Sequence, residues 1–122
     1  QILFNDSEKG LSDEAKKEYI RPFKNAGEDR RPTLTWPRQI PIDGSPEAVI
    51  DEVTKNGEFH KNSDIPKLFI NADPGTILIG KQREFVRSWT NLKEVTVKGN
   101  HFVQEDSPHE IGEALKVFIE TI

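Results

Sequence analysis

His101 follows a short β-branched run and is the residue of this chain best suited to proton transfer. An imidazole changes charge near neutral pH and can serve as a general base. Residues 93–98 predict a strand that ends at Gly99, and a loop after a strand can direct a side chain across the end of a sheet. A second interpretation stays open, because a single loop histidine is more often a surface or hydrogen-bonded structural residue.

The helix expected after this loop carries three separate start signals. Ser107 and Glu110 have the spacing of a capping box, and Pro108 would occupy the first helical position. Glu105 and Asp106 precede the helix N-terminus, where negative charge is favourable. We therefore expect a structural role for these two carboxylates.

The composition limits the classes of protein that the chain can represent. A length of 122 residues allows one domain at most, and 34% hydrophobic with 31% charged residues is typical of a soluble globular segment. A net charge of −4 without a basic stripe argues against nucleic acid as a partner. The absence of cysteine excludes a thiolate nucleophile and a cysteine metal site. No apolar run could span a bilayer, so we expect no membrane partner and a cytoplasmic location, with a periplasmic one as the alternative.

The first half of the chain predicts two helices separated by a loop. Ser12, followed by two acidic residues, indicates a helix start, and this helix should end before Pro22. Residues 27–46 are rich in proline and predict a loop. A second helix should begin at Ser45 and Pro46 and fade near Gly57.

The second half of the chain predicts an alternation of strands and helices. A buried strand is expected over residues 65–71, a turn at Asp73-Pro74-Gly75, a helix over residues 80–89, and then the strand and helix around His101. This order favours a parallel sheet with right-handed crossovers. One face of the last helix is apolar, and we expect His60 and His109 to be exposed on their helices; the apolar face comprises Ile111, Leu115, Phe118, Ile119 and Ile122.

Two parallel strands cannot bury both of their faces by themselves. The consecutive apolar residues 68–70 therefore require neighbours that this sequence does not supply. We expect the chain to be the C-terminal portion of a larger fold, or to pair with a separate chain.

Three segments together resemble one known family. They are RRPTLTWPRQIPI at residues 30–42, IPKLFINADPG at residues 65–75 and HFVQEDSP at residues 101–108. The pattern is similar to the haloalkane dehalogenases, and within them to the branch that includes the hexachlorocyclohexane-degrading enzyme. The resemblance implies an α/β-hydrolase fold, in which residues 1–60 form part of a helical cap domain. Residues 61–122 would then supply the last two strands and the helices of the core.

The resemblance also implies a mechanism without metal or organic cofactor. In this family an aspartate attacks the carbon that bears the halogen, and a histidine then activates water to hydrolyse the alkyl-enzyme ester. The products of the halogenated hydrocarbon are an alcohol, a halide ion and a proton. His101 matches the family's histidine, whereas these 122 residues contain no nucleophile elbow. We therefore expect the activity to require a missing N-terminal half, and the segment alone to be inactive.

A second carboxylate orients the histidine in the family, and its location differs between branches. In the branch that this chain resembles, it is a glutamate after an earlier strand, outside these residues. In another branch it is an aspartate after the penultimate strand, which makes Asp73 a candidate for the orienting acid. Asp73 before Pro74-Gly75 is also an ordinary turn former, and we favour that interpretation.

The resemblance assigns pocket roles to six further residues. A pocket with few polar groups suits a haloalkane, which offers almost nothing to hydrogen-bond. Alternatives remain, since Trp36 could anchor the core of the cap and Ile77 could be ordinary packing. The candidates are Trp36, Pro37 and Ile40 as cap residues facing substrate or halide, and Thr76, Ile77 and Phe102 as lining near the tunnel or the histidine.

Two other functions compete with dehalogenation. Coelenterazine luciferases resemble the dehalogenases in this region and would make the protein an oxygenase on the same scaffold, although residues 40–42 and 66–71 look nearer the dehalogenases. A non-catalytic binding module that folds alone is the third hypothesis. A melting curve of the isolated chain distinguishes the last from the first two.

Overall fold

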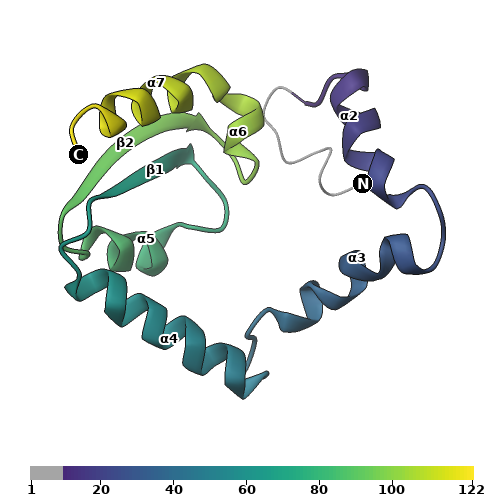
Figure 1. The fold of residues 1–122 in the computed structure, drawn as a ribbon, viewed down its shortest axis with the longest axis horizontal. Helices are drawn as coiled ribbons and strands as arrows, with labels where there is room; N and C mark the ends of the chain where they lie inside the picture. Colours follow the sequence, from purple (N-terminus) through teal and green to yellow (C-terminus); the bar gives the residue numbers. More distant parts are fainter. Residues whose placement is uncertain (1–9) are drawn as a thin grey trace. The chain divides into compact units, whose positions relative to one another are not determined.

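A computed structural model describes residues 10–122 of the chain. These residues form two compact units, one of which is Ser12–Phe59, and the other contains His60–Ile122 together with Leu11 (Figure 1). Among the described residues no helix is long and apolar enough to cross a membrane.

The unit Ser12–Phe59 begins with helix α2 (Asp13–Ile20), followed by the short 3-10 helix η1 (Arg21–Phe23). The Ser12 hydroxyl accepts a hydrogen bond from the backbone N–H of Ala15 at 3.1 Å, which satisfies one of the free donors at the helix start. The predicted start at Ser12 and the predicted end before Pro22 are both confirmed.

The loop predicted over residues 27–46 is wrong, because this segment contains three short helices. They are η2 (Glu28–Arg30), α3 (Arg31–Thr35) and η3 (Pro37–Gln39). Pro32 and Pro37 lie in the first turns of α3 and η3, where a missing N–H costs nothing and the fixed φ of proline suits a helix. The prolines therefore begin helical turns here.

Helix α4 (Glu47–Asn62) continues through Gly57, so the predicted end near that glycine is also wrong. One glycine inside a helix costs only about 1 kcal/mol, which the turns on both sides offset. The expected exposure of His60 is also wrong, because its ring stacks on Trp89, with centroids 5.0 Å apart, and is half-buried. His109 is exposed, as expected.

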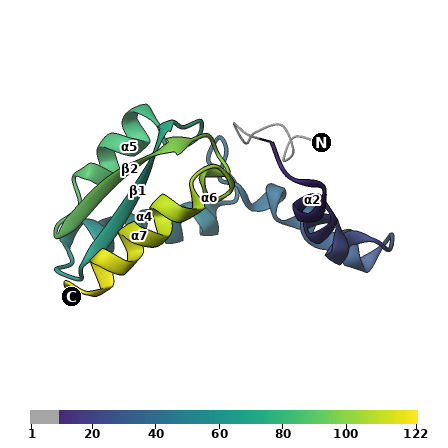
Figure 2. The same ribbon diagram turned by 90° about the horizontal axis from the view of Figure 1, so that it is seen from above.

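The second unit is built on a two-stranded parallel sheet, which confirms the predicted strand orientation. Strand β1 (Lys67–Pro74) pairs with β2 (Leu92–Gly99) in a register that runs from Lys67 opposite Leu92 to Pro74 opposite Gly99. Helices α5 (Gly80–Arg87) and α7 (Pro108–Ile119) lie on opposite faces of this sheet (Figure 2). The order strand, helix, strand, helix is the one that the sequence predicts.

The core of the sheet is small. Phe69 and Val97 are buried, whereas Leu68 and Ile70 on either side of Phe69 are only half-buried. Buried Asn71 donates from its side-chain nitrogen to the Thr96 hydroxyl at 3.0 Å, which joins the two strands by a polar contact. On α7, the predicted apolar face is half-buried at some positions and exposed at others; Ile111 and Phe118 are half-buried, and Leu115, Ile119 and Ile122 are exposed.

Strand β1 is longer than predicted and includes Asp73 and Pro74, so the expected turn at Asp73-Pro74-Gly75 begins only at Gly75. A proline is acceptable at this position because it closes the strand, where no further ladder donor is needed. Asp73 lies opposite Lys98 in the register, so the two opposite charges are neighbours across the strands.

Between β2 and α7 lies a short helix that the sequence does not predict, α6 (Val103–Asp106). Helix α7 starts at Pro108 as predicted, but the capping box does not form: the Ser107 side chain makes no cap hydrogen bond. Its hydroxyl donates to the Lys98 backbone carbonyl at 2.6 Å. The serine therefore ties the helix start to the end of β2.

Candidate functional site at the carboxyl ends of the strands

His101 lies in the turn between β2 and α6, with its imidazole exposed. The ring meets the adjacent Phe102 ring edge to face, with centroids 4.7 Å apart and planes inclined by 69°. This aromatic contact limits the directions that the imidazole can take while leaving it accessible to a small molecule.

Asp106 determines the shape of the turn that carries His101. Its side chain is 2% exposed, and its carboxylate accepts a hydrogen bond from the backbone N–H of Asn100 at 3.0 Å. At Gly99 the chain passes so close that a Cβ would lie 3.0 Å from both Cβ and Oδ2 of Asp106. The carboxylate thus has the structural role expected for it, although the sequence gives no signal for this partner.

The parallel register brings the loops after β1 and β2 together. The N–H of Gly75 donates to the Gly99 carbonyl at 3.0 Å, which joins the starts of the two loops. A hollow of about 190 Å³ opens there, and His101, Thr76 and Ile77 line it. The other lining residues are Phe69, Ile70, Ala72, Gly75, Leu78, Asn100 and Val103.

Three of the predicted site residues, His101, Thr76 and Ile77, therefore line the same hollow. Phe102 does not line the hollow but contacts the His101 ring. The walls are mostly apolar side chains, with the imidazole as the titratable group among them. Such an arrangement can accept a small apolar molecule and offer it, or a water beside it, a proton acceptor.

Asp73 is the next-to-last residue of β1. It is exposed in β1, and within residues 10–122 no hydrogen bond joins its carboxylate to His101. The structure therefore shows no hydrogen bond through which Asp73 would orient His101, and this role of Asp73 stays a prediction.

The predicted cap residues belong to the unit Ser12–Phe59. Trp36 is 71% exposed and, with Ile40, lines a second hollow of about 250 Å³ between η3 and α4. Pro37 is the first residue of η3 and is not among the lining residues, which also include Gln39, Pro41, Val49 and Val53. The hollow shows that this segment presents apolar side chains at its surface.

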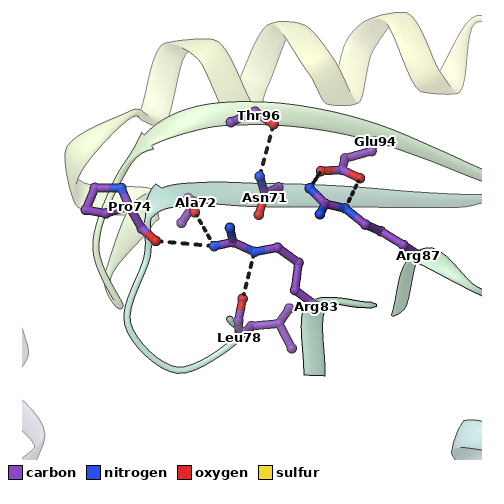
Figure 3. A network of polar contacts seen from close by, with 8 residues as sticks. All are labelled: Asn71, Ala72, Pro74, Leu78, Arg83, Arg87, Glu94 and Thr96. Atoms are coloured by element: carbon purple, nitrogen blue, oxygen red, sulfur yellow. Dashed lines mark hydrogen bonds and ion pairs between the residues drawn. The ribbon is translucent and has the colours of Figure 1, made fainter. Parts of the chain in front are cut away.

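Two arginines on α5 make polar contacts with the sheet and with the segment that follows β1 (Figure 3). Arg87 forms a two-pronged pair with Glu94 of β2, with Nε 2.8 Å from Oε2 and Nη2 2.7 Å from Oε1. This hydrogen bonding raises the pKa of Arg87 and lowers the pKa of Glu94.

Arg83 instead donates to three backbone carbonyls. Nη2 lies 2.9 Å from the Ala72 oxygen and 3.3 Å from the Pro74 oxygen, and Nε lies 3.2 Å from the Leu78 oxygen. Sequence reasoning missed this residue, and an arginine on the helix after a strand-end glycine is the only signal that could have found it. Within the described part of the chain, no cluster of three or more metal-ligating side chains is present.

No protein-family model matches the chain. Among curated proteins, a haloalkane dehalogenase of Mycolicibacterium smegmatis is 56% identical over 114 residues, which are 92% of this chain and 36% of that enzyme. A haloalkane dehalogenase of Sphingobium indicum is 51% identical over 109 residues, 89% of this chain and 37% of the enzyme. The coelenterazine h 2-monooxygenase of Renilla reniformis is 42% identical over 106 residues, 85% of this chain and 34% of that protein.

Solved structures similar to this chain are also haloalkane dehalogenases. The haloalkane dehalogenase DbeA of Bradyrhizobium elkani superposes with a TM-score of 0.90 at 31% identity, covering 99% of this chain and 42% of that structure. DatA of Agrobacterium tumefaciens, also a haloalkane dehalogenase, gives a TM-score of 0.89 at 26% identity, with coverage of 99% and 42%.

The parallel strands and their flanking helices superpose on these haloalkane dehalogenase structures, which gives the chain the α/β-hydrolase fold class. The chain belongs to the haloalkane dehalogenase family. It spans a little over a third of the length of the curated relatives that it matches.

Proposed function

We propose that the protein hydrolyses carbon–halogen bonds of haloalkanes, with His101 as the base that activates water. The observation that carries this proposal is the 51–56% identity to haloalkane dehalogenases over about nine-tenths of the chain. The apolar hollow beside His101 supports it, because a haloalkane needs an apolar environment and few hydrogen-bond partners.

The proposed reaction has two steps. An aspartate outside these 122 residues attacks the carbon, forms an ester and releases halide; the attack removes no proton and so needs no base. His101 then takes a proton from a water molecule, whose oxygen attacks the ester carbonyl. The ester C–O bond on the carbonyl side breaks, which frees the alcohol and restores the carboxylate.

The organisation of the molecule follows from the same proposal. Residues 1–60 form part of a cap domain that presents Trp36, Pro37 and Ile40 to substrate or halide. Residues 61–122 belong to the core, in which Thr76, Ile77 and Phe102 surround the alkyl group or the histidine. We also propose that the activity needs an N-terminal part of the protein, which together with these 122 residues makes up the full-length protein.

The experiment uses the His101→Ala variant of the full-length protein with a 1-bromoalkane as substrate. We expect about one equivalent of bromide per active site in a burst, followed by turnover lower by roughly 10²–10⁴-fold, the usual contribution of a general base. Intact-protein mass spectrometry should show the mass of the trapped alkyl group. An unmodified variant that releases no bromide in a burst would refute the role of His101 at the hydrolysis step.

Asp73→Asn is the companion variant. Because Asp73 makes no hydrogen bond to His101, we expect a much smaller loss of turnover than in His101→Ala, and no trapped ester. A trapped ester in Asp73→Asn would identify Asp73 as the orienting acid.

A luciferase-type oxygenase is the second candidate, and the relative from Renilla reniformis favours it. Light emission on adding coelenterazine and oxygen to the full-length protein, together with the absence of halide release from any haloalkane, would replace the dehalogenase proposal with this one.

A further inference from the structure

We propose that Arg83 determines which alkyl chain lengths the hollow beside His101 accepts, by fixing the position of the segment Thr76–Leu78. This inference rests on the proposed function for the nature of the substrate. Arg83 does not line the hollow, so it is a positioning residue that acts through the backbone of this segment.

The Arg83 guanidinium joins two parts of the chain that meet at the hollow. Its Nη2 donates to the carbonyls of Ala72 and Pro74 at the end of β1, and its Nε donates to the carbonyl of Leu78 at the end of the segment Thr76–Leu78 (Figure 3). A planar group with five N–H donors in a rigid fork can hold several carbonyls in one geometry. One side chain thus holds both ends of the segment that carries Thr76 and Ile77.

Within residues 10–122, the segment has few other contacts that could fix it. Ile77 and Leu78 are 62% and 44% exposed, so packing against the other described residues contributes little to their position. The backbone hydrogen bonds of the loop are those from Gly75 N–H to Gly99 and from Ile79 N–H to the Ile77 carbonyl, the latter within a three-residue turn. In the part of the chain that the structure describes, Arg83 is therefore the main side-chain link between the loop and the helix that follows it.

Gly75 makes this close approach of the guanidinium feasible. At this residue φ is +68°, and a Cβ would lie 2.8 Å from the Ala72 oxygen and 3.0 Å from Nη2 of Arg83. A side chain here would push the guanidinium away from the carbonyls that it holds. The glycine and the arginine thus form one local arrangement.

Arg87 provides a matched control on the same helix. It lies four residues after Arg83, and its side chain donates to the Glu94 carboxylate and, among the described residues, to no carbonyl of the 75–79 loop. Replacing either arginine by methionine removes one charge from α5 and keeps a long unbranched side chain. Only Arg83→Met removes hydrogen bonds from the lining segment.

The test measures kcat/KM of the full-length protein for 1-bromobutane and 1-bromohexane. Loss of folded protein lowers both values equally, whereas a displaced lining segment changes their ratio. The change in this ratio is limited, because one or two methylene groups contribute only a small difference in binding free energy. We expect the ratio to change by about fivefold in Arg83→Met. In Arg87→Met it should stay within about twofold, and Arg83→Lys, which retains a donor, should lie between them.

A second measurement does not depend on activity. Hydrogen exchange of a peptide covering residues 75–79 should be about tenfold faster in Arg83→Met than in the parent protein, and unchanged in Arg87→Met. If Arg83→Met does not fold, Arg83→Lys takes its place in both measurements, with smaller changes in the same direction.

The outcomes separate this inference from the proposed function. Equal exchange in the two methionine variants would overturn the positioning role, whatever the activity. Faster exchange in Arg83→Met with an unchanged substrate ratio would overturn the claim about chain length. A parent protein that releases no halide from any haloalkane would end the proposed function and the chain-length claim together, and the exchange data would still decide whether Arg83 positions the segment.

Discussion

The contacts within each of the two units differ in kind. In Ser12–Phe59 no described residue is buried, and the ion pairs join residues three positions apart. In the sheet unit, hydrogen bonds connect residues that are distant in sequence, such as Asn71 with Thr96. The helices of the first unit are therefore specified by neighbouring residues, whereas the site around His101 depends on contacts across the sheet.

This difference predicts where the two units are sensitive to change. Exposed ion pairs contribute little to stability, and isolated helices of this length are marginal in water. Substitutions in Ser12–Phe59 should therefore have small effects that follow helix propensity and capping. Substitutions at buried polar contacts of the sheet unit should have large effects that propensity does not predict.

The largest expected effect compares two serines that both precede a helix. Ser107→Asp places a charge in a buried position beside the Lys98 carbonyl and Asp106, and should lower the free energy of unfolding of the full-length protein by about 3 kcal/mol or more. Ser12→Asp keeps a side-chain acceptor at an exposed N-cap, so its change should stay within about 0.5 kcal/mol. Urea unfolding measures both values, and equal losses would contradict the proposed difference between the units.

The next effect compares two aspartates. Asp106→Ala removes the acceptor of the Asn100 N–H from a buried site and should cost about 2 kcal/mol. Asp51→Ala, at an exposed position of α4, should change stability by less than about 0.5 kcal/mol. A loss at Asp106 as small as the loss at Asp51 would show that the turn before α6 does not depend on this carboxylate.

The smallest effect concerns Glu94, whose pKa is lowered from its ordinary value of 4.5 by the hydrogen bonds from Arg87. A lowered pKa in the folded state adds stability above the unfolded pKa, and this stability is lost as the pH falls through the folded pKa. We therefore expect Glu94→Gln to reduce the acid sensitivity of unfolding slightly. Carboxyl titration by NMR is the direct measurement, and a Glu94 pKa at or above 4.5 would contradict the pair.

Local signals in the sequence predicted the elements whose ends depend on neighbouring residues. The start of α2 at Asp13, the start of α7 at Pro108 and the parallel pairing of the strands are confirmed. The loop prediction over residues 27–46 failed because proline was treated as a helix breaker, although proline in a first turn favours a helix.

Individual side-chain hydrogen bonds to distant partners could not be predicted. Ser107 has the sequence spacing of a capping residue, yet its hydroxyl donates a hydrogen bond to the carbonyl of Lys98, nine residues earlier. For the site, the sequence named His101, Thr76 and Ile77, which the structure brings to one hollow, while their roles stay predictions. Arg83 was missed because its hydrogen bonds are to backbone carbonyls, which carry no residue-type signal.

The pairing of Pro74 with Gly99 also constrains how the length of this chain can vary. Both loops of the site leave the sheet at the same level, so the position of His101 along the strand direction is coupled to that of Thr76. Inserting one residue into either strand would shift one loop by about 3.3 Å and turn alternate side chains to the other face. Added residues in the segment between η1 and η2 would cause no such shift. Among natural or engineered variants, we expect length changes to spare residues 67–74 and 92–99 and to gather outside the sheet.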